Sequence, residues 1–113
     1  MAKKALFKNY TFEFDKNEIK IISNFCKQAV SQMQDDNKFA GYVNTFNSIL
    51  DKLHSGEEKI KFTKQERQLL VSQLNENIKF IDGKIAESWI IKKWFYRSIR
   101  TQYQMLIDNH FSD

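Results

Sequence analysis

The stretch Tyr10-Thr-Phe-Glu-Phe14, followed directly by Asp15-Lys-Asn-Glu18, sets the pattern of the whole chain. Apolar and polar side chains alternate over the first five residues, which is typical of a half-buried strand. Asp15 then stands three positions before Glu18, which is the spacing of a capping box that begins a helix. The stretch therefore predicts a short strand that leads directly into a capped helix.

The same order returns in the second half of the chain, at an offset of 48 residues that matches Phe12 with Ile60. Lys59-Ile-Lys-Phe62 alternates as a short strand, and Thr63 with Glu66 repeats the capping-box spacing. The repeat is either a coincidence, since capping boxes after strands are common, or the mark of a pseudo-twofold fold. In the pseudo-twofold fold the two strands pair as a ribbon beside four helices. If they do not pair, the fold is a four-helix bundle with extended connectors.

Apolar residues at helical spacing predict four helices along the chain. Asp35-Asp36-Asn37 separates the first two, Ser55-Gly56 ends the second, and Asp82-Gly83 separates the last two. Gly56 is free to adopt the left-handed conformation at the end of its helix. The predicted fold class is mainly α: four helices and two short strands paired as a ribbon, in a small single domain over residues 1–113 with a flexible segment at 1–9. The helices are expected over residues 16–34, 39–54, 64–81 and 84–109.

The composition fits one soluble globular domain. With 113 residues, no proline and three glycines, the chain favours long helices and is too short for two self-sufficient domains. Its single cysteine excludes an internal disulfide and fits a reducing cytosol. There is no apolar run of signal-peptide or membrane-spanning length, so we expect a cytoplasmic protein with no membrane contact. Lysine outnumbers arginine 15 to 3, as AT-rich coding sequence produces, which indicates a low-GC bacterium or its phages and plasmids.

No residue pattern points to catalysis or to a metal. His54 and His110 stand alone near predicted helix ends, and Cys26 falls on an apolar helix face, where burial makes a thiol unreactive. The adjacent acids Asp35-Asp36 and Glu57-Glu58 lie in connectors, whereas acid–base catalysis needs two carboxyl groups held in different environments. We therefore predict no enzyme, no catalytic residue, no metal and no cofactor.

The last predicted helix is apolar on more than one side. One broad face forms the expected core stripe, while Ile90, Ile91, Trp94 and Met105 point toward the back of the helix. Such a helix is either central and wrapped by the others, or presents a second surface to a partner. The core stripe consists of Ile85, Trp89, Phe95, Tyr96, Ile99, Tyr103, Leu106 and Ile107.

The same helix concentrates the positive charge of the chain. Residues 84–104 hold five cations and one acid, a net charge of +4 that equals that of the whole chain. Lys93, Arg97 and Arg100 fall within about 60° of one another on a helical wheel. Arginine suits bidentate contacts to carboxylates and phosphates, and it stacks on aromatic rings.

Two functions follow from this combination of aromatic and basic residues. The preferred one is a non-enzymatic, regulatory or inhibitor-type protein that binds a protein partner through Ile90, Trp94, Arg97 and Met105. A homodimer that buries the same residues is a variant of it. The alternative is a nucleic-acid-binding module that uses Lys93, Arg97 and Arg100, although five cations are few and no recognition motif accompanies them.

Overall fold

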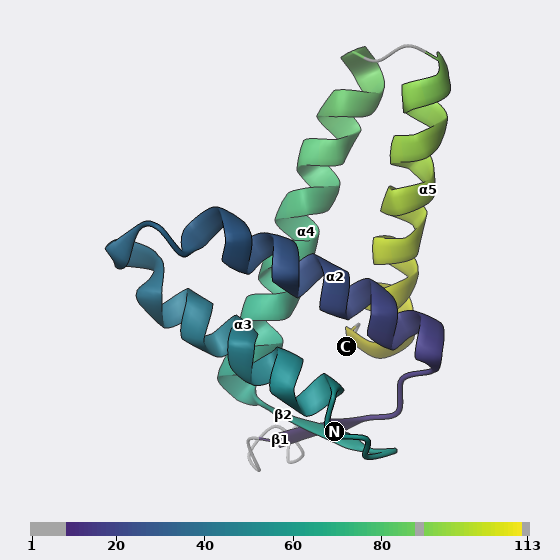
Figure 1. Cartoon of the computed structure of the whole chain (residues 1–113). Helices are drawn as coiled ribbons and strands as arrows, with labels where there is room; N and C mark the ends of the chain where they lie inside the picture. Colours follow the sequence, from purple (N-terminus) through teal and green to yellow (C-terminus); the bar gives the residue numbers. More distant parts are fainter. Residues whose placement is uncertain (1–8, 88–89, 112–113) are drawn as a thin grey trace. The chain divides into compact units, whose positions relative to one another are not determined.

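The computed structural model describes residues 9–87 and 90–111 and is mainly helical (Figure 1). Four helices and one two-stranded antiparallel sheet occur within this part of the chain, in agreement with the predicted fold class. Residues 1–8 of the predicted N-terminal segment and Trp89 of the predicted core stripe lie outside it. The elements are β1 (Asn9–Phe12), α2 (Lys16–Met33), the 3₁₀ turn η1 (Asn37–Phe39), α3 (Ala40–Leu53), β2 (Ile60–Thr63), α4 (Lys64–Glu87), α5 (Ile90–Leu106) and the π-helical turn η2 (Ile107–Phe111).

Both predicted capping boxes are present. At the start of α2, the Asp15 carboxylate accepts the Glu18 amide at 2.7 Å, and the Glu18 carboxylate accepts the Asp15 amide at 3.0 Å. At the start of α4, the Thr63 hydroxyl accepts the Glu66 amide at 3.1 Å, and Glu66 accepts the Thr63 amide at 2.8 Å. Each box satisfies two backbone donors that a helix start would otherwise leave open.

The two strands pair as the predicted ribbon, but the ribbon is not twofold symmetric. Phe12 lies opposite Ile60, its match in the sequence repeat, and the ladder runs from there to Asn9 opposite Thr63. A twofold axis at the Phe12–Ile60 pair would also pair residues 13–15 with 57–59, and the ladder does not extend there. The reason is that residues 57–59 still complete the turn that follows α3. The repeat therefore specifies the order of the elements and not a symmetric pairing.

The chain divides into two compact units, Met1–Leu70 and Val71–Asp113, and the boundary falls within α4. In the first unit, α2 and α3 form an antiparallel hairpin, and the ribbon lies at the end of α3 (Figure 1). The rings of Phe12 and Phe62 lie 5.4 Å apart across the ribbon, and Phe14 stacks on Phe12 at 5.4 Å. The buried apolar side chains of this unit are Phe12, Phe14, Ile22, Phe25, Cys26, Ala29, Phe46, Ile49, Leu53, Ile60, Phe62 and Leu70.

Of the helix ends predicted at Gly56 and at Asp82-Gly83, the structure contains only the first. Gly56 follows α3 with a φ of 85°, which confirms the left-handed turn. The break predicted at Asp82-Gly83 is wrong, because α4 continues through both residues to Glu87. Glycine in a helix interior costs about 1 kcal/mol relative to alanine but does not forbid the helical conformation. The apolar spacing of Ile78, Ile81 and Ile85 carries the helix across it.

Candidate functional site

The candidate surface lies on α5, in the second unit. α4 and α5 run antiparallel there (Figure 1), and the Arg100 guanidinium donates from Nε to the Asp82 carboxylate at 2.5 Å. Both side chains are partly exposed, so this ion pair contributes at most about 1 kcal/mol to stability. The ion pair has a larger effect on charge, because the Asp82 carboxylate neutralises the positive charge of Arg100.

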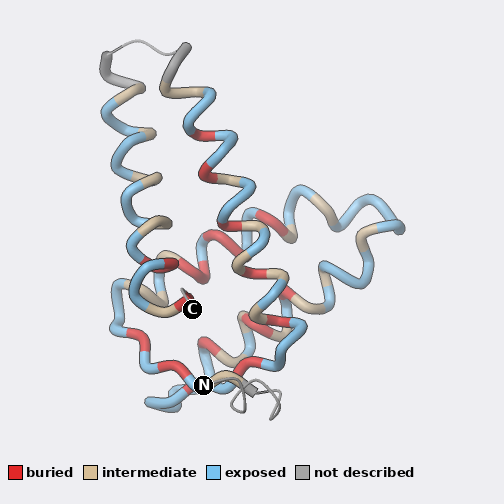
Figure 2. Tube along the Cα trace, turned by 180° about the vertical axis from the view of Figure 1, so that it is seen from behind, coloured by how far each residue is buried: buried red, intermediate tan, exposed pale blue. Residues whose placement is uncertain are grey.

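The predicted core stripe of the last helix is only partly right. Phe95 is 57% exposed, whereas Leu106 and Ile107 near the end of the helix are buried as predicted. From Lys93 to Met105 no described side chain of α5 is buried, and the tube of α5 in Figure 2 is pale blue and tan over these turns. Within its own unit α5 runs beside a single helix, which is too little to bury a broad apolar stripe. The stripe residues that are only half-buried are Ile85, Tyr96, Ile99 and Tyr103.

The opposite face of α5 carries the predicted partner-binding residues. Trp94 is 76% exposed and Met105 is 55% exposed, and Arg97 is also exposed. Trp94 and Met105 lie on the same side of the helix, three turns and about 16 Å apart along its axis. Ile90 begins α5, but its side chain lies outside the described ones. Exposure is the condition that a partner surface requires, and binding itself stays a prediction.

A shallow depression of about 330 Å³ lies on this face of α5. Its described lining consists of Trp94, Arg97, Ser98, Thr101 and Gln102, all of them on α5. Ser98, Thr101 and Gln102 were not among the predicted site residues. The signal was available, because they follow Trp94 by four, seven and eight positions, the spacing of one helix face.

The charges on α5 are unevenly paired. Within the part of the chain that the structure describes, no ion pair involves Lys93 or Arg97, whereas Arg100 is held by Asp82. The segment Ile90–Leu106 contains no acidic residue of its own. We name the exposed residues Trp94, Arg97, Ser98, Thr101, Gln102 and Met105 the α5 surface; half-buried Lys93 lies at its edge.

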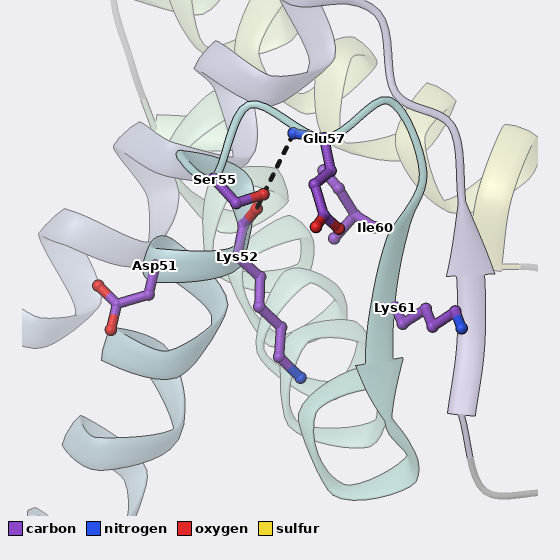
Figure 3. Close-up of a pocket in the computed structure, with 6 residues that line it drawn as sticks. All are labelled: Asp51, Lys52, Ser55, Glu57, Ile60 and Lys61. Carbon is purple, nitrogen blue, oxygen red and sulfur yellow. Dashed lines mark hydrogen bonds between the residues drawn. The ribbon is translucent and has the colours of Figure 1, made fainter.

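A second concavity, of about 430 Å³, lies in the first unit where α3 turns into β2. Figure 3 shows the Asp51, Lys52 and Lys61 side chains directed away from one another. Lys52 reaches the Glu66 carboxylate at 2.6 Å, and the Glu57 amide donates to the Ser55 hydroxyl at 3.3 Å. Polar groups that diverge in this way do not converge on a ligand, so we do not assign a site here.

The Cys26 thiol and the Ser23 hydroxyl of the first unit are buried, whereas His54 is exposed. Cys26 is fully buried, as predicted, and burial raises the pKa of its thiol to about 12, so the thiol stays protonated at neutral pH. The Ser23 hydroxyl lies 3.2 Å from Nε2 of His54, but Ser23 is only 4% exposed. His54 thus has a side-chain partner that was not predicted from the sequence. Among the described residues, no three His, Cys, Asp or Glu side chains are grouped so that they could hold a metal ion.

Comparisons with protein-family models, with curated proteins and with solved structures find no match for this chain. None of the described helices combines the length and the apolar character needed to cross a membrane.

Proposed function

We propose that this chain is a non-enzymatic cytoplasmic protein, of a regulatory or inhibitor type, that binds a protein partner through the α5 surface. The observation that carries the proposal is the 76% exposure of Trp94, on the same helix face as Arg97 and Met105. Tryptophan and arginine are the residue types that most often dominate the binding energy of protein interfaces. An exposed tryptophan beside an arginine that forms no ion pair with any described residue supplies both in one place.

The incomplete burial of α5 supports the same proposal. Phe95 adds a third large apolar side chain that is more than half exposed on this helix, besides Trp94 and Met105. Exposed apolar area costs about 25 cal/mol per Å², and a partner that covers it recovers that free energy. Removing one such anchor from an interface typically costs 2 kcal/mol or more of binding free energy, which is about thirtyfold in affinity.

The nucleic-acid alternative has less support. Arg100 is neutralised by Asp82, which leaves Lys93 and Arg97 of the three residues assigned to phosphate contacts. Two phosphate contacts would give a log–log salt slope of only about −2. Backbone-tracking grooves for single strands combine more cations with several stacking rings.

Site-specific photocrosslinking tests the proposal. The full chain, with a benzophenone amino acid in place of Trp94, is irradiated in the cells that naturally express it. The control carries the same group in place of Tyr42, an aromatic residue of the first unit that is 48% exposed. We expect a discrete adduct with another protein at position 94 only, and its loss when Arg97→Ala is added.

Two other outcomes would contradict the proposal, and a third would identify its homodimer variant. Equal labelling from positions 94 and 42 would show that the α5 surface has no specific partner. An adduct that nuclease removes would favour the nucleic-acid function. An adduct of twice the chain mass would show that the surface closes a homodimer.

A further inference from the structure

Resting on the proposed function, we infer that the partner presents an acidic amphipathic segment to α5. Its carboxylates face Arg97 and Lys93, and its apolar side chains cover Trp94 and Met105. The charge and the side-chain spacing of the α5 surface favour this occupant.

The positive charge of the α5 surface favours an acidic partner. Arg97 is exposed, has no ion-pair partner among the described residues, and stands on a helix with no acid between Ile90 and Leu106. A partner that covered this guanidinium with neutral atoms would strip its water without replacing the lost interaction, which is unfavourable. A carboxylate replaces it with two parallel charge-assisted hydrogen bonds. Lys93, one turn away, offers a second positive charge, its ammonium group, to an acidic side chain of the partner.

The spacing of the side chains along α5 favours an amphipathic segment. Arg97 follows Trp94 by three positions, so the two side chains are neighbours on the helix surface, with Cβ atoms about 5–6 Å apart. Trp94 and Arg97 both line the depression, together with Ser98 and Thr101, whose small side chains leave room for an inserted group. Met105 marks the far end of the surface, about 16 Å from Trp94 along the axis. An extended or helical segment laid along α5 therefore meets an apolar anchor, a cation and a second apolar anchor.

The same features argue against a second copy of the chain on this face. In a twofold homodimer each α5 surface would meet another that carries Lys93 and Arg97 and no acid. Like charges brought together at an interface oppose association. An acidic segment of another protein avoids this repulsion.

Selection from a displayed library of random 16-residue peptides tests the inference. The bait is the full-length chain, and the parallel baits are Trp94→Ala, Arg97→Glu and the control Lys79→Glu. Lys79 is an exposed cation of α4 whose reversal changes the net charge equally. We expect peptides that need Trp94 to be enriched in Asp and Glu beside Leu, Phe or Trp. Arg97→Glu should weaken a selected peptide by at least about tenfold, and Lys79→Glu should leave it within about twofold.

The outcomes separate this inference from the proposed function. Peptides that need Trp94 but show no acidic enrichment, or that bind Arg97→Glu as well as the parent chain, overturn the acidic partner and keep the α5 surface. Peptides that bind Trp94→Ala equally well, or the absence of any peptide that needs Trp94, overturn both. Circular dichroism of each variant confirms that the helices are intact.

Discussion

Glu66 is the residue on which several parts of the first unit depend. The residue is only 5% exposed. In the capping box of α4 it accepts a hydrogen bond from the Thr63 amide, and it also accepts hydrogen bonds from the Ser48 hydroxyl at 2.5 Å and from the Lys52 ammonium at 2.6 Å. Burial alone would raise its pKa, but the hydrogen bonds from Lys52, Ser48 and the Thr63 amide outweigh burial, and the pKa is lowered. One carboxylate therefore joins α3 to the first turn of α4.

Replacing this carboxylate should cost stability in a pH-dependent way. Because the pKa of Glu66 is lower in the folded state than its unfolded value of about 4.3, its contribution is present above that pH. The contribution is lost as the pH falls through 4.3 toward the folded pKa. We expect Glu66→Gln to lower the unfolding free energy by about 2 kcal/mol at pH 7 and by less at pH 3, in urea titrations.

The matched control is Glu18→Gln, at the same position of the first capping box. The hydrogen bonds of that box are exposed, so the loss should be a few tenths of a kcal/mol to about 1 kcal/mol. If the two substitutions cost the same at pH 7, or if the effect of Glu66→Gln does not shrink toward pH 3, the network around Glu66 does not stabilise the fold as described.

At the scale of the elements, two glycines show why a helix end is harder to predict than a helix start. Gly56 has a φ of 85° after α3, whereas Gly83 lies in the interior of α4 with an ordinary helical backbone. In both places an added Cβ would meet nothing within 4 Å beyond its chain neighbours and the backbone of its own helix. Only the backbone conformation distinguishes them.

The same substitution at these two positions should therefore have opposite effects. Gly83→Ala should raise the unfolding free energy by about 1 kcal/mol, because alanine loses less conformational entropy in a helix. Gly56→Ala should lower it by about 1–2 kcal/mol, because a side chain is disfavoured at positive φ. Thermal and urea unfolding of the two variants measures both; a loss of stability in Gly83→Ala would contradict the continuous α4.

The local signals of the sequence were reliable where the interactions are local. Asp15–Glu18 and Thr63–Glu66 lie three residues apart, so their hydrogen bonds form within one turn, and the period of the strands fixed which side chains are buried. The role of Phe95 was not predictable in this way. Phe95 belongs to the apolar stripe by its spacing, but its predicted burial is wrong, because whether a stripe is buried depends on how many elements pack against it.

On the scale of the whole molecule, apolar burial is unevenly distributed. The first unit buries side chains of the ribbon, α2 and α3 around the fully buried Phe46 and Phe62. Over Lys93–Met105, by contrast, α5 has no buried side chain among those described. Local stability follows the buried contacts that an element makes, so the two regions should open with different free energies.

Native-state hydrogen exchange should reveal this difference. We expect amides of α5 around residues 97–102 to exchange at least about tenfold faster than amides of α2 around Ile22–Cys26, where four of the five side chains are buried. A peptide that binds the α5 surface should slow the exchange of α5 and leave α2 unchanged. Equal protection of both helices in the free chain would contradict the proposed lack of support for α5.

The sequence by itself determined the class of the fold, its four helices, both capped helix starts and the concentration of charge on the last helix. These properties depend on residues a few positions apart, whose interactions survive in any arrangement of the elements. Only the tertiary structure decided that the ladder stops at Phe12 and Ile60, that α4 continues through Gly83, and that Arg100 is paired with Asp82 while Arg97 is not. Tertiary structure also left Trp94 and Phe95 exposed, because side-chain burial is set by the elements that pack against a helix and not by the helix alone.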